Sequence, residues 1–288
     1  MGEAIYLDGR FLSDRAEAQV SLFDRGYLLG DAVFDTLRVW QGRPIALALH
    51  VTRFLRSAAA VGITVPEPRE RLLTIAERLA AASAHPDAVL RMSVSRGEGP
   101  RGIGDVGYLH PVLAMFVEPN APPPPDAYQK GVPTEILPTP RIPPECLDPT
   151  IKAAQYLPAI LARQLLSRRG LKEGIQRALD GSLVSGLVSS LFLVEAGILK
   201  TPPLGLGAFP GITRATLLEV ASRLSIPVRE ERLLPEQLYA ASEAFFASSL
   251  IGCLPIREVD ARPLATCPGP ICARLSAELE RRWTQEGA

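Results

Sequence analysis

The chain has 288 residues, with 31 basic and 31 acidic side chains and 47% hydrophobic residues. This composition is typical of a folded globular protein and argues against wholesale disorder. A protein that binds nucleic-acid phosphates carries a basic excess or stripe, and the zero net charge argues against that class of function. No apolar run approaches the roughly 20 residues that span a bilayer, and the N-terminus lacks a basic, apolar leader.

The four cysteines are too few for a disulfide scaffold, and their spacing fits no common zinc site, so we expect reduced thiols, no metal and a cytoplasmic location. Only four basic residues are lysines, so each can be considered individually. They are Lys130, Lys152, Lys172 and Lys200.

In chain order, the pattern predicts a hairpin over 4–12, strands at 33–40 and 45–47, helices over 50–61 and 70–82, and strands at 88–95 and 112–117. A proline cluster follows, and it predicts a stiff linker over 119–127 between an N-terminal domain of residues 1–118 and a C-terminal domain of residues 128–288. Proline-rich residues 138–149 predict an ordered loop that leads into Lys152.

In the second part we predict strands at 133–137, 174–179, 191–194, 198–201 and 244–248. We predict helices over 157–168, 211–224, 235–240 and 270–282. Helices and strands mix without the regular alternation of a doubly wound sheet. The predicted fold class is therefore α+β.

Four segments could carry chemistry, and each has a simpler interpretation. Gly97 to Gly102 fits G-x-G-x-x-G, but the residues that follow are poor helix formers, which favours a glycine-rich loop over a dinucleotide site. Lys152 has mostly small or apolar neighbours, which suits either a nucleophilic amine or an exposed loop lysine. The run Phe209 to Arg214 predicts an anion site at a helix start, or a plain cap by Thr213. Arg53, near a helix start, could bind phosphate or lie on the surface.

Together and in this order, these segments resemble the class IV aminotransferases, the fold-type IV pyridoxal 5'-phosphate (PLP) enzymes. That family includes branched-chain aminotransferases, D-amino-acid aminotransferases and aminodeoxychorismate lyases. The resemblance covers almost the whole chain. Its strongest segments are DRGYLLGDAVFDTLRV at 24–39, IKAAQYL at 151–157 and TPPL through GITR at 201–214.

The resemblance implies a two-domain fold-type IV architecture, a smaller N-terminal and a larger C-terminal domain, a homodimer, and transfer of an amino group between an amino acid and a 2-oxo acid. It implies that Lys152 forms the Schiff base with PLP and moves the substrate proton. The implied cofactor-binding residues are Arg53, Tyr156, Ser185, Ile212, Thr213 and Ser249. The implied substrate residues are Phe34, Arg38, Arg91, Arg101 and Ser248.

The sequence departs from the family pattern where a glutamate normally faces the pyridine nitrogen of PLP. Ser185 stands at that position, and Ser190 stands where an asparagine is usual. Ala32 for glycine and Asp35 for glutamate are milder departures. A serine hydroxyl can bond to the ring nitrogen but cannot hold a proton there electrostatically, so the ring becomes a weaker electron sink.

Three functions follow from the resemblance. The leading one is amino-group transfer. The second is aminodeoxychorismate lyase chemistry, which forms 4-aminobenzoate and pyruvate, because residues 95–102 resemble the corresponding loop of those lyases. The third, of another class, is a catalytically degenerate homologue that binds PLP or another ligand without turnover.

Overall fold

The computed structural model describes residues 4–100, 102–104 and 109–286. The chain forms two compact units. Unit 1 comprises the chain up to Ala121, with Ile151–Gln155 and the chain from Trp283; unit 2 comprises Pro122–Thr150 and Tyr156–Arg282. The boundary near Ala121 lies inside the proline cluster. We expected two domains that are each contiguous in sequence. Instead, the short segment around Lys152 belongs to unit 1, although unit 2 precedes and follows it in the chain.

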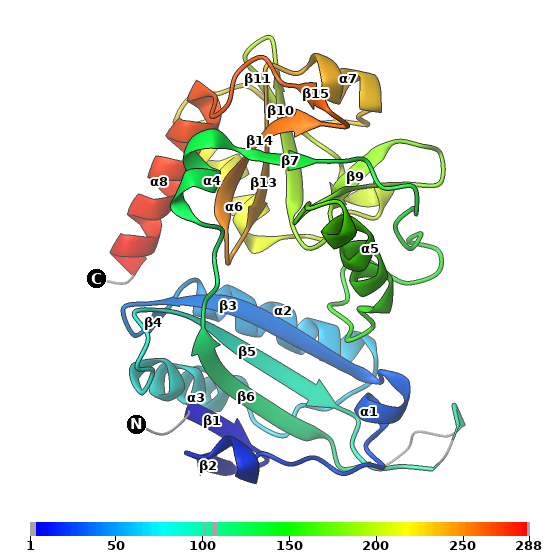
Figure 1. The fold of residues 1–288 in the computed structure, drawn as a ribbon. Coiled ribbons are helices and arrows are strands. Elements are labelled where there is room, and N and C mark those ends of the chain that lie inside the picture. Colours follow the sequence, from blue (N-terminus) through cyan, green and yellow to red (C-terminus); the bar gives the residue numbers. More distant parts are fainter. Residues whose placement is uncertain (1–3, 101, 105–108, 287–288) are drawn as a thin grey trace. The chain divides into compact units, whose positions relative to one another are not determined.

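Unit 1 is built on a six-stranded antiparallel sheet in the order β2-β1-β6-β5-β3-β4 (Figure 1). The strands are β1 (Ala4–Leu7), β2 (Arg10–Leu12), β3 (Ala32–Trp40), β4 (Arg43–Pro44), β5 (Asp87–Ser95) and β6 (Val112–Pro119). The helices are α1 (Arg25–Leu29), α2 (Leu47–Ala60) and α3 (Arg69–Ala81), with a 3-10 turn at Arg15–Glu17.

Helices α2 and α3 cover one face of this sheet, and the core of unit 1 lies beneath them. Leu37 of β3, Phe54 of α2, Ile75 of α3 and Leu90 of β5 are all fully buried there. Successive residues of a strand point to opposite faces. The neighbours of Leu37 on β3 therefore point to the face without these helices.

Unit 2 contains a seven-stranded mixed sheet in the order β12-β11-β10-β13-β14-β15, with β7 beside β14, and a separate β8-β9 hairpin. Its strands are β7 (Val132–Thr134), β8 (Ile175–Arg177), β9 (Leu183–Gly186), β10 (Ser190–Glu195), β11 (Ile198–Thr201), β12 (Val228–Glu230), β13 (Glu243–Ser248), β14 (Gly252–Val259) and β15 (Arg262–Pro263). Its helices are α4 (Pro125–Lys130), α5 (Leu157–Arg168), α6 (Ile212–Arg223), α7 (Pro235–Ala240) and α8 (Pro270–Glu286), whose last turn passes into unit 1, and a 3-10 turn spans Leu204–Leu206. Leu193, Phe246, Leu254 and Ile256 lie in its core.

The α+β class predicted from the sequence is confirmed. So are the N-terminal hairpin, the long strands of unit 1 and the β10–β11 hairpin. The strand predicted at 45–47 is wrong, because the chain turns into α2 at Leu47 after Ala46 adopts a left-handed conformation with φ of 52°. No helix among the described residues has the length and apolar character to cross a bilayer.

Candidate active site

The segment that carries Lys152 runs beside the first residues of β3 in unit 1. The backbone N–H of Phe34 donates to the carbonyl of Lys152 at 2.9 Å, and the N–H of Ala154 donates to the carbonyl of Ala32 at 2.9 Å. The N–H of Lys152 donates to the Ser57 hydroxyl of α2 at 3.2 Å. These three bonds hold the lysine backbone against the sheet although about 115 residues separate it from β3.

The Lys152 side chain shares an aromatic neighbour with Arg91. Its Nζ lies 4.8 Å from the centre of the Phe34 ring, and the guanidinium carbon of Arg91 lies 3.9 Å from the same centre. Arg91 Nε also donates to Ser93 Oγ at 3.1 Å. Phe34 is buried, whereas Lys152 and Arg91 are half-buried. The structure thus brings together three residues that the sequence proposed as catalytic or substrate-binding.

On the opposite side of β3, Asp35 lies beneath α2 with His50 and Arg53. Arg53 donates from Nε to Asp35 Oδ2 at 2.7 Å and from Nη2 to Oδ1 at 2.8 Å. His50 Nδ1 lies 2.7 Å from Asp35 Oδ1. All three side chains are buried. Arg53 is therefore not the simple surface arginine that the sequence allowed as an alternative.

The ionisation of this cluster follows from its contacts. Burial by itself raises the pKa of Asp35, but the hydrogen bonds and charges of Arg53 and His50 outweigh it and hold the pKa well below its usual range. Burial lowers the pKa of His50, and the contact with Asp35 opposes that shift. An ionised Asp35 accepts from both partners. The pair with Asp35 uses two of the five guanidinium N–H groups and fixes the orientation of Arg53.

Arg38 lies on the same strand as Phe34, but its contacts are different. Its Nε and Nη2 donate to the two carboxylate oxygens of Asp87 at 2.8 and 2.9 Å. Its guanidinium lies 4.8 Å from the Trp40 ring centre and 5.0 Å from that of Trp283. A two-point ion pair and two aromatic contacts are typical of a residue that stabilises the local structure. This arrangement weighs against the role of Arg38 as a substrate-carboxylate contact.

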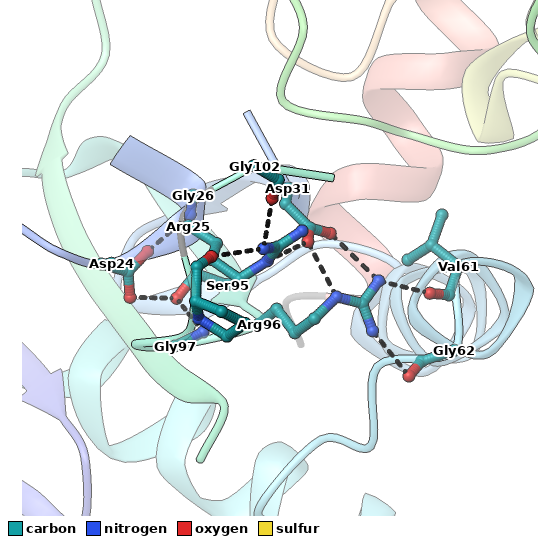
Figure 2. Close-up of polar contacts among 11 residues, drawn as sticks. Asp24, Arg25, Gly26, Asp31, Val61, Gly62, Ser95, Arg96, Gly97 and Gly102 are labelled. Carbon is teal, nitrogen blue, oxygen red and sulfur yellow. Dashed lines mark hydrogen bonds and ion pairs between the residues drawn. The ribbon is translucent and has the colours of Figure 1, made fainter. Parts of the chain in front are cut away.

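The glycine-rich segment that begins at Gly97 is held by Arg25, which shares the Asp31 carboxylate with Arg96 (Figure 2). Arg25 Nε and Arg96 Nε donate to the same oxygen of Asp31 at 3.0 and 2.8 Å. Arg25 Nη1 also donates to the carbonyls of Pro100 and Gly102 at 3.1 and 2.8 Å. Burial raises the pKa of Asp31, but the hydrogen bonds from the two arginines outweigh it, so the net shift is downward. Arg25 therefore fixes the described ends of the segment on either side of Arg101.

The described part of this segment forms a loop after β5, so the glycine-rich loop interpretation is confirmed and the helix required by a dinucleotide site does not follow Gly97–Pro100 or residues 102–104. Arg101, which the resemblance proposed as a substrate contact, lies outside the described residues.

In unit 2, helix α6 begins at Ile212 after Gly211, and no side-chain bond caps it. The expected alternative, in which Thr213 is the cap, is wrong, since Thr213 lies inside the first turn. The Thr213 hydroxyl lies 3.2 Å from that of Ser249. Ser248 ends β13 one residue earlier. The first-turn amides and two hydroxyls of this region form a donor set of the kind that binds phosphate.

The arginine of the GITR segment is structural. Arg214 Nη2 donates to the Pro202 carbonyl at 3.0 Å and to Glu230 Oε2 at 2.6 Å. These contacts join the start of α6 to β12 and to the loop after β11. They account for the TPPL and GITR segments as parts of one local structure.

Ser185 lies in the β8–β9 hairpin, buried, opposite Gln176. Its hydroxyl donates to the Gly186 carbonyl at 2.8 Å and lies 3.4 Å from Arg141 Nη1. Arg141 Nη1 also donates to Gln176 Oε1 at 3.1 Å, and its Nε donates to the Gly207 carbonyl at 2.7 Å. Burial lowers the pKa of Arg141, and the electrostatic effect of Tyr156 opposes it.

The sequence analysis did not identify Arg141, Gln176, Ser57 or the ion pair of Asp35 with Arg53. Arg141 stands in a proline-rich loop, and no local pattern marks it. Tyr156 is half-buried immediately before α5, where it acts electrostatically on Arg141.

Comparison with known proteins identifies the family. The model of class IV amino-transferases matches residues 32–259. The chain belongs to the class IV aminotransferase family. A branched-chain aminotransferase from the archaeon Thermoproteus uzoniensis, solved with norvaline, superposes with a TM-score of 0.89 at 30% identity over 98% of this chain and 94% of that one.

Two further relatives of this class IV protein are named for other activities. A D-alanine aminotransferase of Staphylococcus aureus is 27% identical over 97% of both chains. The 4-amino-4-deoxychorismate lyase of Pseudomonas aeruginosa superposes with a TM-score of 0.83 at 28% identity, over 96% of this chain and 98% of that one. The predicted fold-type IV architecture is thereby confirmed.

Class IV aminotransferases use PLP, and the donors in this chain fit that group. Lys152 offers an amine beside an aromatic ring. The uncapped start of α6, with the hydroxyls of Thr213 and Ser249, suits a phosphate. Ser185 and Arg141 present hydrogen-bond donors, which suit an acceptor atom such as a pyridine nitrogen.

Proposed function

We propose that the protein is a PLP-dependent aminotransferase that moves an amino group between an amino acid and a 2-oxo acid. The observation that carries this proposal is the position of Lys152. Two hydrogen bonds fix its backbone and a third fixes that of Ala154, and the amine of this half-buried lysine lies 4.8 Å from the centre of the Phe34 ring, which Arg91 also contacts. The amino acid is of the branched-chain or D type, the two aminotransferase substrates named among its relatives.

When bound, PLP supplies the electron sink and carries the amino group. The work of the protein is to hold this group and the substrate and to move one proton. Lys152 would be the nucleophile that holds the cofactor, and its amine would take the proton from the substrate carbon and deliver it to the cofactor side, as transfer of the amino group requires. Ser57 and β3 hold the lysine backbone, which restricts the positions that the amine can reach.

Phosphate binding is assigned to the amides of Ile212 and Thr213, to the hydroxyls of Thr213 and Ser249, and to Arg53. Asp35 orients Arg53 through a two-point ion pair. Tyr156 would bond near the phenolic oxygen of the cofactor, and Ser185 would face its ring nitrogen. These assignments follow the positions of the family pattern, and Ser185 differs from it because it occupies the position of the usual glutamate.

Substrate binding is assigned to Phe34 and Arg91, with Ser248 and Arg101 as further contacts to the carboxylate. Arg91 is favoured among the arginines because it lies 3.9 Å from Phe34, the ring that Lys152 also contacts. Arg38 is the least suited, since Asp87 already binds two of its N–H groups.

The scarcity of lysine makes the test direct. The purified protein is incubated with PLP, its absorbance is recorded, and it is then reduced with borohydride and mapped by peptide mass. We expect a violet-region band and a phosphopyridoxyl adduct on Lys152. Lys130, Lys172 and Lys200 are internal controls, and Lys200 is already ion-paired with Glu195 and Glu231 at 2.5 and 2.7 Å. A protein with neither band nor adduct would be a non-catalytic homologue, the alternative of another class.

A second candidate function is aminodeoxychorismate lyase. It is favoured by the resemblance of residues 95–102 to the lyase loop and by the similarity to the Pseudomonas lyase. Release of pyruvate from aminodeoxychorismate, compared with transfer of the amino group of an amino acid to 2-oxoglutarate, separates the two functions. A homodimer is also proposed, and light scattering on the eluted protein would measure its mass.

A further inference from the structure

We propose that Arg141, acting with Ser185, keeps the ring nitrogen of PLP unprotonated in this protein. The inference rests on the proposed function, in which Ser185 faces that nitrogen. It names Arg141 as a positioning residue and an electrostatic determinant, a role to which no sequence pattern pointed.

The first step is the geometry around Ser185. Arg141 Nη1 lies 3.4 Å from Ser185 Oγ and 3.1 Å from Gln176 Oε1. Its Nε is anchored by the Gly207 carbonyl at 2.7 Å, so the guanidinium cannot swing away without losing a short bond. Gln176 and Ser185 face each other across the β8–β9 hairpin. The guanidinium thus spans the two residues of one cross-strand pair.

The second step is the charge of this group. The hydrogen-bond partners of Arg141 within the described chain are a carbonyl, an amide and a hydroxyl, all neutral. Four other arginines of the described chain contrast with it, because each has a carboxylate partner: Arg38 with Asp87, Arg53 with Asp35, Arg96 with Asp31 and Arg214 with Glu230. The titratable group that acts on Arg141 is the phenol of Tyr156. An arginine stays protonated in proteins, so the positive charge at Ser185 is not neutralised by a carboxylate.

The third step is what this charge does to a ring nitrogen opposite Ser185. A like charge nearby disfavours protonation of the ring. The guanidinium donates toward Ser185 Oγ, which leaves the serine O–H able to rotate from the Gly186 carbonyl and donate to a nitrogen lone pair. Arg141 would donate to Ser185, and Ser185 would donate to the ring nitrogen. This direction of hydrogen bonding requires a lone pair on the nitrogen and is unfavourable for a pyridinium N–H. The ring is then a weaker electron sink, which favours reactions that need less stabilisation of negative charge by the cofactor.

The test measures the protonation state of the ring nitrogen and does not depend on turnover. The protein is loaded with PLP labelled with ¹⁵N in the ring, and the ¹⁵N chemical shift is followed from pH 6 to pH 9. We expect the unprotonated shift throughout in the natural protein. Ser185→Glu should restore the protonated shift at neutral pH, because a carboxylate would stand between the guanidinium and the ring.

Two variants at Arg141 form a matched pair. Arg141→Gln removes the charge and should raise the pKa of the ring nitrogen by about 1–3 units, the usual effect of one adjacent charge. Arg141→Lys retains the charge and should keep the nitrogen unprotonated. Circular dichroism shows which variants fold. If Arg141→Gln does not fold, the ¹⁵N shift of the natural protein still tests the inference, because it requires an unprotonated nitrogen at neutral pH.

A protonated ring nitrogen in the natural protein at neutral pH would overturn the inference. Equal ¹⁵N titrations for Arg141→Gln and Arg141→Lys would also overturn it, because the charge would then have no effect. Both results leave the Lys152 adduct intact and thus the proposed function standing. Absence of any adduct on Lys152 is the separate result that would remove the proposed function itself.

Discussion

Asp35 and Arg53 form a buried two-point ion pair between neighbouring elements, from β3 to α2, with both N···O distances between 2.7 and 2.8 Å. Asp35 directly follows Phe34 on the strand, and successive side chains point to opposite faces. Phe34 therefore faces Lys152, and Asp35 faces the helix layer. The pair therefore orients Arg53 and also anchors the part of β3 that carries Phe34.

The first prediction concerns the strength of this pair. Asp35→Asn leaves the guanidinium of Arg53 buried without its counter-charge, which costs about 3–5 kcal/mol in the free energy of unfolding. Urea denaturation of the two proteins measures the difference. The matched control is Asp87→Asn, which breaks the Arg38 pair, whose side chains retain some solvent contact; we expect about 1 kcal/mol there. Equal losses in both variants would show that burial does not govern the Asp35 pair.

The second prediction concerns pH and Glu173. This side chain is buried in unit 2, where Oε1 accepts the N–H groups of Leu187 at 2.7 Å and Gly174 at 3.2 Å. Burial raises the pKa of Glu173, and these hydrogen bonds only partly offset the rise. A folded state with a raised carboxyl pKa binds its proton more tightly than the unfolded state. The contribution to stability is thus fully present below the unfolded pKa and is lost as pH rises through the folded pKa.

Glu173→Gln removes this ionisation while its amide oxygen can still accept from Leu187. We expect the natural protein to lose stability relative to the variant as pH rises from about 4 toward neutrality, in the window above the unfolded pKa of glutamate. Denaturant midpoints of both proteins across that range measure the effect. Parallel curves for the two proteins would contradict the assignment.

The third prediction separates backbone strain from a close contact. Gly97 has φ of +83°, and a Cβ atom on it would lie 1.8 Å from the His110 carbonyl oxygen. Gly9 has nearly the same φ, +84°, but open space around it. Gly9→Ala should cost about 1–2 kcal/mol of strain. Gly97→Ala carries the same strain and must also displace the backbone at His110, so it should cost at least about 2 kcal/mol more. Equal thermal stabilities of the two variants would rule out the contact as a constraint.

The fourth prediction distinguishes Arg91 from Arg38 in the proposed reaction. Arg91→Gln should raise KM for the amino-acid substrate roughly 10- to 100-fold, because a charged hydrogen bond to its carboxylate is lost. Arg38→Gln breaks the Asp87 pair and should lower the melting temperature with little change in KM. Steady-state kinetics and thermal melts of both variants test this. A larger KM effect for Arg38→Gln would reverse the assignment of the two arginines.

Local sequence patterns predicted many elements well. Helices α5 and α7 have the expected bounds, since their apolar spacing and the prolines in their first turns are local signals. Strand β14 was not predicted, and it contains Pro255, a residue that is unfavourable inside a sheet. The structure accommodates this proline since residue 255 pairs only with Phe245 of β13, while β7 and β15 pair with β14 from Ile256 onward.

The sequence by itself determined the family, and it marked Lys152 as the proposed Schiff-base lysine and Ser185 as a departure from the family pattern, because these depend on residue identity and order along the chain. Only the tertiary structure decided what each arginine does. Arg38 meets Asp87 and Arg141 meets Ser185 across 49 and 44 residues of chain. Such partners are set by strand register and by the path of loops, which no local pattern encodes. For the same reason, the pairing of Ile151–Gln155 with unit 1 became visible only once the backbone bonds to β3 were known.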